Sequence, residues 1–255
     1  MVMRQVRFLS LILGLGLSLV SGAARPAGVE AVPALSVEDI VAASVAASGG
    51  EALDSVRGVR RDADMHLEGD MFGVLDGRWE IAFVPGQRGF QKADFGSGAT
   101  AIGWDGSVGW EETAMGLRVL NAEEIALNRW LWELSFLHAL VRDSRSGALK
   151  RLSDESIDET LHYVLEYADD RGTQTQIYVD SETSLISRLA TSIDIPMLGR
   201  CAVATDYADY REIDGLMLPQ AMSQVFENLW VYQARFTETE INPELPESMF
   251  TRVQG

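Results

Sequence analysis

The sequence predicts a mainly β protein that folds as one antiparallel sheet, arranged as a meander or an open barrel. Eleven or twelve short segments between residues 59 and 239 have the period-two alternation or the β-branched and aromatic content of strands, and turn signals separate them. Only two longer stretches, residues 36–50 and 121–142, have the apolar spacing of a helix. Many strands with few helices indicate this fold class.

The chain begins with the three parts of a secretory signal peptide, residues 1–23. Arg4 and Arg7 form a basic start, residues 8–20 are apolar and uncharged, and small residues ending at Ala23 follow. We predict cleavage after Ala23, because this apolar run is shorter than the about 20 residues that a membrane-spanning helix needs. A retained N-terminal anchor is the alternative.

The composition argues against several kinds of partner. The sequence holds 21 Lys and Arg against 38 Asp and Glu, a formal net charge of −17. Such a surface repels phosphates and anionic lipid headgroups, so nucleic acid is not expected as a partner. The only cysteine, Cys201, does not follow the predicted cleavage site, so neither a lipid anchor nor an internal disulfide is expected.

The elements follow in a simple order after a predicted flexible tether, residues 24–34, and we expect residues 35–255 to form one domain. Ser36 is a suitable N-cap for a first helix that ends at two glycines. Asp105 and Gly106 form a strong hairpin signal. Strands are expected at residues 59–70, 77–85, 90–95, 99–104 and 108–114, and after the second helix at 149–157, 160–167, 174–179, 185–193, 201–211, 216–226 and 230–239.

The second helix, residues 121–142, has two apolar faces. Asn121 is its expected N-cap, and Ile125, Trp132 and Phe136 lie on the side opposite to Trp130. A helix on the outside of a sheet needs one apolar stripe, so two stripes indicate that it is covered from both directions. Protein on both sides would explain this, and so would a cavity for an apolar ligand on one side.

A surplus of large apolar side chains on the strands supports the cavity, although a strand aromatic is more often ordinary core. A closed sheet of this strand number is expected to leave interior space. The candidate lining residues for an apolar ligand come from the strands and from the second helix. They are Trp79, Phe83, Phe90, Trp104, Trp130, Trp132, Phe136, Leu140, Tyr178, Trp230 and Tyr232.

Signals for an enzyme are weak. The chain has no nucleophile elbow, zinc-protease, phosphate-loop or paired-cysteine motif, and its three histidines are far apart. His66, with Asp64 and Glu68 on one strand face, is the best metal candidate, but any half-exposed strand alternates in this way. We therefore predict no catalytic residue, no metal and no cofactor. An envelope hydrolase built on His66 or His162 remains an open alternative.

The order of several turn motifs resembles that of the outer-membrane lipoprotein-sorting proteins, the LolA-like periplasmic lipoprotein carriers, over most of the predicted mature chain. Each motif alone is a common turn, so the resemblance depends on the order in which the motifs occur along the chain. The motifs are Ser48-Gly49-Gly50, Asp105-Gly106 with Trp110, the hairpin from Asp180 to Leu185, Tyr210 with Asp214-Gly215 and Leu218-Pro219, and Asn242-Pro243 ahead of Phe250.

The resemblance implies a strongly curved, half-open barrel of about eleven antiparallel strands with helices packed on its concave side. It also implies a monomeric, periplasmic, non-enzymatic binding protein that shields acyl chains of a lipoprotein or lipid for transport or sorting to the outer membrane. A partner protein in the inner or outer membrane is compatible with this role. The alternative is an envelope sensor or interaction module of the same fold. The family's strand arginine that holds lid helices closed is not matched to any arginine here.

Overall fold

A computed structural model of the chain describes most of the unit Leu35–Gly255. The predicted signal peptide and tether, and most of the predicted second helix, lie outside the described residues. No helix formed by the described residues is long and apolar enough to cross a membrane. The described residues are 35–70, 73–96, 98–122, 124–125, 128, 149–168, 174–195, 199–227 and 229–252.

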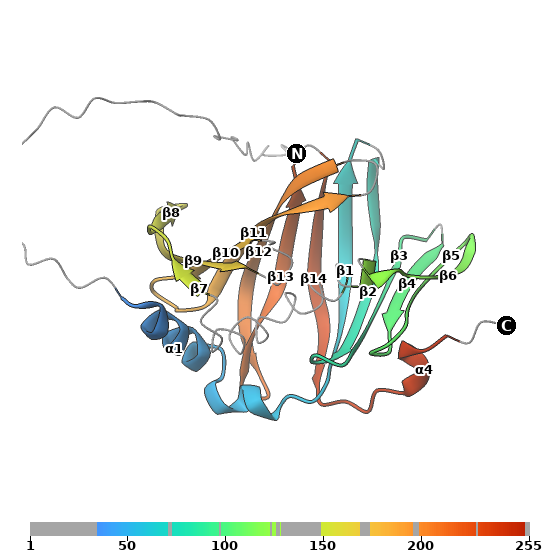
Figure 1. The fold of residues 1–255 in the computed structure, drawn as a ribbon, viewed down its shortest axis with the longest axis horizontal. Coiled ribbons are helices and arrows are strands. Elements are labelled where there is room, and N and C mark those ends of the chain that lie inside the picture. Colours follow the sequence, from blue (N-terminus) through green and yellow to red (C-terminus); the bar gives the residue numbers. More distant parts are fainter. Residues whose placement is uncertain are drawn as a thin grey trace, which may run out of the picture. The chain divides into compact units, whose positions relative to one another are not determined.

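Fourteen strands form one antiparallel sheet that does not close on itself (Figure 1). They are β1 (Val59–Gly69), β2 (Gly73–Val84), β3 (Arg88–Asp94), β4 (Ala99–Trp104), β5 (Gly109–Thr113), β6 (Gly116–Val119), β7 (Leu149–Arg151), β8 (Glu155–Ile157), β9 (Thr160–Ala168), β10 (Gln174–Asp180), β11 (Ile186–Ile195), β12 (Gly199–Ile213), β13 (Leu216–Phe226) and β14 (Trp230–Ile241). The predicted fold class, a mainly β, open and curved antiparallel sheet, is confirmed.

The sheet is assembled from two meanders. Strands β1 to β6 pair in sequence order, as do β9 to β14, and β1 pairs with β14 from Val59 opposite Ile241 to Gly69 opposite Trp230. The first and last strands therefore lie side by side in the middle of the sheet (Figure 1). Strands β6 and β7 lie toward its two opposite edges, and residues 120–148 connect them.

The strands number fourteen and not about eleven, for two local reasons. The predicted segment 149–157 is interrupted, because β7 and β8 pair with different parts of β9 and residues 152–154 leave the ladder between them. The short strand β6, which pairs with β5, was not predicted. All four of its residues are exposed, so it lacks the buried alternation by which a strand is found in a sequence.

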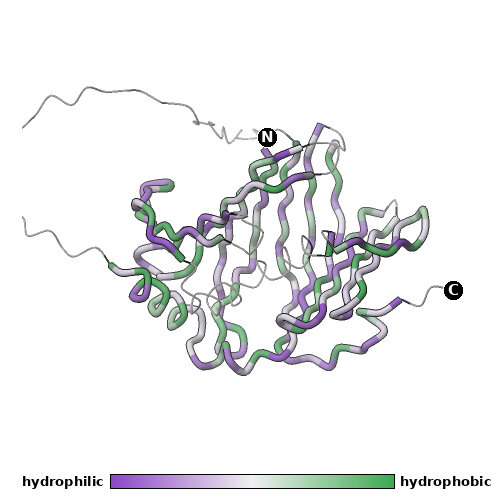
Figure 2. Tube along the Cα trace, in the orientation of Figure 1, coloured by the Kyte–Doolittle hydropathy of each residue, from purple (hydrophilic) through white to green (hydrophobic). Residues whose placement is uncertain are grey.

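The main core lies on one face of the sheet, which we call the concave face. Apolar and polar residues alternate along the strands (Figure 2). The apolar residues of β1, β2 and β9 to β14 that point to this face form one buried cluster. Its members on the two central strands, β1 and β14, are Val59, Ala63, Met65, Ala234 and Phe236.

Helices pack on both faces of the sheet. Helix α1 (Val37–Ala47), capped by Ser36 and Asp39 as predicted, and the 3-10 helix η1 (Gly50–Ser55) pack against the main core. Helix α4 (Glu247–Phe250), which was not predicted, lies on the opposite face. There Phe250 completes a second cluster with Phe90 and Trp110.

Two turn motifs meet below the concave face. Gly49 has a φ of 127°, and a Cβ there would lie 2.6 Å from the carbonyl oxygen of Gly215. The amide N–H of Met217 donates to the carbonyl of Ser48 at 3.2 Å. Ser48-Gly49-Gly50 and Asp214-Gly215 thus act together as a junction between α1 and β13.

We expect Gly49→Ala to lower the free energy of unfolding by about 1–3 kcal/mol, because an L side chain at this φ is strained and also meets the Gly215 carbonyl. Urea denaturation measures the change. Gly50→Ala is the matched control, since Gly50 has a φ of 54° and open space at the Cβ position. If both variants lose equal stability, the close approach to Gly215 is not the cause.

Candidate functional site

Aromatic side chains cross the central strands on the concave face. In the register of the sheet, Ala63 on β1 lies between Trp79 on β2 and Phe236 on β14. The Trp79 ring is 6.2 Å from Phe236 and 5.4 Å from Tyr232, the latter edge-on at 80°. The small side chain of Ala63 leaves room for these rings, so they form a continuous apolar cluster across β2, β1 and β14.

The aromatic surface continues toward the start of β14. Trp230 lies on the same side as Tyr232 and stacks on Phe226 of β13, with ring centroids 4.8 Å apart. Both rings are only partly buried, whereas Met65 and Met222, which flank Ala234 further along the face, are buried. This end of the concave face therefore offers partly exposed aromatic surface.

One cation lies within this apolar face. Arg61 on β1 points to the same side as Val59 and Ala63 and is only 2% exposed. Its Nε donates to Thr239 Oγ1 at 3.1 Å, and its Nη2 donates to the carbonyl of Pro219 at 2.5 Å. The guanidinium carbon lies 3.3 Å from the centre of the Phe236 ring.

Burial disfavours the charge of this guanidinium. Desolvation lowers the pKa of Arg61 to about 9, and the neighbouring Tyr210 and Tyr207 only partly oppose this. Burial also raises the pKa of both tyrosines. At neutral pH, Arg61 is therefore a cation beside neutral phenols in a desolvated environment.

Five of the predicted lining residues share one face of the sheet. Trp79, Phe83, Trp104, Trp230 and Tyr232 are on the concave face. Phe90 is on the opposite face, because it pairs with Ala82, and it packs with Trp110 against Phe250. Trp130, Trp132, Phe136 and Leu140 lie outside the described residues.

Tyr178 is also on the opposite face. It pairs with Val164 and Arg188, whereas Ile177 before it belongs to the main core. Its hydroxyl donates to Gln176 Oε1 at 3.1 Å, and burial, together with Glu155, raises its pKa. Phe90 and Tyr178 therefore do not share a surface with Trp79, although all three are large, apolar and buried.

The start of the second helix is described and agrees with the prediction. The side chain of Asn121 accepts from the amide N–H of Glu124 at 2.9 Å, and Glu124 accepts from the amide of Asn121 at 2.9 Å. A Cβ at Gly109 would lie 2.4 Å from Ile125, and Gly109 pairs with Trp104. The first turn of this helix therefore packs on the concave face.

Sequence reasoning missed Arg61. The alternation of β1 assigns Val59, Ala63, Met65 and Leu67 to the concave face, and Arg61 occupies the same phase. A basic residue on the apolar phase of a central strand was the available signal. This signal is weak, because one charged residue among apolar ones can also mark a local interruption of the alternation.

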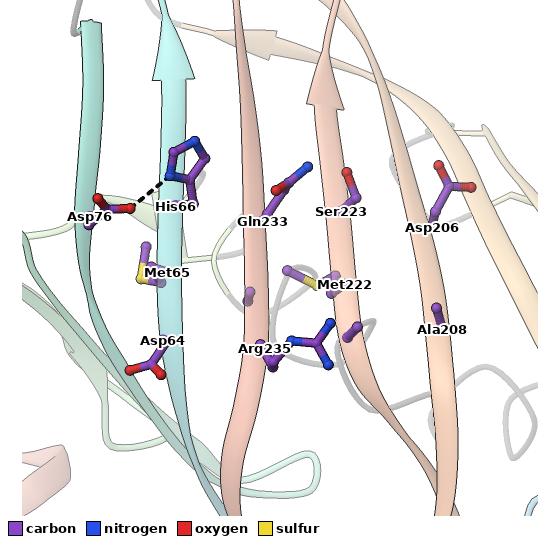
Figure 3. A pocket seen from close by; sticks show the side chains of 12 residues that line it. Asp64, Met65, His66, Asp76, Asp206, Ala208, Met222, Ser223, Gln233 and Arg235 are labelled. Atoms are coloured by element: carbon purple, nitrogen blue, oxygen red, sulfur yellow. Dashed lines mark hydrogen bonds and ion pairs between the residues drawn. The ribbon is translucent and has the colours of Figure 1, made fainter. Parts of the chain in front are cut away.

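The opposite face of the same strands has a hollow of about 520 Å³ that is lined by both polar and apolar residues (Figure 3). His66 Nδ1 on β1 and Asp76 Oδ1 on β2 lie within hydrogen-bond distance, 2.7 Å apart, at its side, and small residues such as Ala208 and Ala221 line it. Among the described residues, no group of three or more His, Cys, Asp or Glu side chains is placed to hold a metal ion. The described partner of His66 is thus Asp76 on the neighbouring strand β2.

Comparisons with known proteins identify the fold. No family model matches the chain, and no curated protein matches it in sequence. A crystal structure of a LolA superfamily protein from Nitrosomonas europaea matches with a TM-score of 0.55 and 16% identity, over 86% of this chain and 99% of that one. A putative outer membrane lipoprotein-sorting protein domain from Vibrio parahaemolyticus matches with a TM-score of 0.52 and 13% identity, over 83% and 94%.

A DUF1329 family protein from Desulfovibrio piger is also similar in structure, with a TM-score of 0.55 and 14% identity, over 84% of this chain and 97% of that one. The concave sheet with its apolar face therefore defines an open β half-barrel. The fold is similar to that of the LolA superfamily protein and the lipoprotein-sorting domain, as the resemblance in the turn motifs predicted.

Proposed function

We propose that this protein is an exported, periplasmic carrier that shields acyl chains of a lipoprotein or lipid on the concave face of its sheet. The observation that carries the proposal is the partly exposed aromatic surface formed by Trp230 and Phe226, next to Tyr232 at the edge of the main core. The fold shared with lipoprotein-sorting domains supports the same class of ligand.

The chemistry of this surface suits acyl chains. Each buried CH₂ group contributes about 0.8 kcal/mol, so a long chain crosses water only inside an apolar sleeve. Aromatic rings and methionines provide most of the surface of such a sleeve, and the polar side chains of Arg61 and Gln224 on the same face are hydrogen-bonded within the protein. The acidic exterior, with a net charge of −17, keeps a diffusing carrier soluble.

Further parts of the proposal concern location and assembly. We place the protein in the periplasm as a monomer without cofactor, released by cleavage after Ala23 and handed its ligand by a membrane partner. The export signal in residues 1–23 and the position of Cys201 away from that cleavage site support this.

The test is native mass spectrometry of the mature chain, followed by organic extraction. We expect an acyl-chain ligand to co-purify, and Trp230→Asp to lower its occupancy about tenfold or more, because a carboxylate would face the hydrocarbon. Val231→Asp is the matched control, since Val231 is the next residue and points to the opposite face. A clean apo mass, with no uptake of added lipid or lipopeptide, would contradict the proposal.

A further inference from the structure

Two adjacent arginines on β1 have opposite electrostatic surroundings. Arg60 lies on the face opposite to the concave one, which we call the convex face. It is within 4 Å of three carboxylates, those of Asp62, Glu80 and Glu240. Arg61, on the concave face, forms no ion pair with any described residue. The sequence has 38 acidic residues, so the absence of a carboxylate beside Arg61 in this part of the chain is a specific feature of its position.

All described contacts of the Arg61 guanidinium are with neutral groups. They are the Pro219 carbonyl, the Thr239 hydroxyl and the face of the Phe236 ring, and the two hydrogen bonds use Nε and Nη2. A guanidinium has five N–H donors, arranged as a fork that matches two oxygens of one anion. The contacts therefore orient the group without neutralising it.

Such a charge is costly in an apolar environment. A buried cation is normally paired with an anion, because desolvation costs several kcal/mol per ion. Burial disfavours the charged form here, as the lowered pKa of Arg61 shows. An anion that enters the concave face would therefore gain more from Arg61 than from any arginine exposed to water.

Building on the proposed binding of acyl chains, we propose that Arg61 is the head-group site of the concave face and that the ligand is a lipid with an anionic oxygen group. The group is the carboxylate of a fatty acid or the phosphate of a phospholipid, and either fits the guanidinium fork. The acyl chain lies along the apolar residues beside Arg61, toward Trp79 and Tyr232.

The acidic surface increases the preference of the site for amphiphilic lipids over small anions. A net charge of −17 repels small anions in solution, so phosphate or acetate alone gains little from a buried arginine. An acyl chain contributes binding that does not depend on charge, and it brings the head group to Arg61. The site therefore favours amphiphiles that combine both parts.

The test compares pairs of ligands that differ only in the head group. Delipidated mature protein is titrated with palmitate and hexadecanol, and with dipalmitoyl phosphatidate and dipalmitoylglycerol, with intrinsic tryptophan fluorescence as the readout. We expect at least one anionic lipid to bind about tenfold or more tightly than its neutral partner. The anionic lipid that shows the larger preference identifies the head group as carboxylate or phosphate.

Variants of Arg61 test whether the preference for anionic lipids depends on this residue. Arg61→Met is expected to remove the difference in affinity between acid and alcohol. Arg61→Lys retains a charge and is expected to keep part of the difference. Arg60→Met, on the opposite face, is the control and is expected to keep all of it.

Two failures are distinguishable. If the unmodified protein binds acids and neutral lipids equally, Arg61 is not a head-group site while acyl binding stands, and this holds even if the variants do not fold. If neither acid nor alcohol binds, the proposed carrier function itself is wrong, and the head-group site is wrong with it.

Discussion

Replacing Phe250 with alanine is expected to lower the free energy of unfolding by about 3–5 kcal/mol, the range for a fully buried phenylalanine. Phe250 is 0% exposed and is the largest fully buried side chain among the described residues. It lies against Phe90 and Trp110 on the convex face, with the Arg88 guanidinium 4.7 Å from its ring. A cavity there would remove the contact that attaches the C-terminal segment to the sheet.

Equilibrium denaturation in urea measures this loss. Ser248→Ala is the control, because Ser248 is an exposed residue of the same helical turn and should change stability by less than about 0.5 kcal/mol. The Trp110 Nε1–H donates to the Phe250 carbonyl at 2.7 Å, a bond that the alanine variant can keep. A loss below about 1 kcal/mol would mean that the C-terminal segment does not depend on this side chain.

Replacing Ile40 with alanine is expected to cost about 2–5 kcal/mol. Ile40 is 1% exposed and is the one fully buried apolar side chain of α1, so it anchors this helix in the main core. The capping box of Ser36 and Asp39 keeps the helix formed but does not hold it on the sheet. The variant should therefore lose helix docking rather than helix formation.

Hydrogen exchange followed by mass spectrometry separates these effects. Protection should fall in α1 and in the residues of β13 that contact it, while β2 to β5 keep theirs. Val45→Ala, at a partly buried position of the same helix, should have a much smaller effect. If Ile40→Ala lowers protection evenly over the whole sheet, α1 is part of one cooperative unit and not a separately docked helix.

The motifs that carried the family resemblance prove to be structural. Asp180 Oδ1 accepts the amide N–H groups of Glu182 and Thr183 at 2.8 Å each, and the Tyr210 hydroxyl donates to the Ile186 carbonyl at 2.6 Å. The Asn242 side chain accepts the amide of Arg57 at 2.6 Å and joins the chain before β1 to the end of β14. These residues determine turns and strand pairing, so they are better predictors of the fold than of the ligand that the protein binds.

Local patterns in the sequence determined most of the strands, several turns and the N-caps of the two predicted helices. Alternation with period two and side chains that cap nearby amides act over a few residues, so Ser36, Asn121 and Asp105 could be assigned correctly without the fold. The same reasoning could not say which aromatic residues share a surface. Alternation separates the two faces of one strand, but it does not show which face of another strand lies on the same side of the sheet.

Only the tertiary structure decided that relation. The pairing of β1 with β14 joins residues 161 to 182 positions apart, and no local signal specifies it. This pairing places Trp79, Tyr232 and Phe236 on one surface, and the register of β3 against β2 excludes Phe90 from it. It also surrounds Arg61 with Thr239 and Phe236, so an ordinary arginine in the sequence becomes a buried cation without a carboxylate among the described residues.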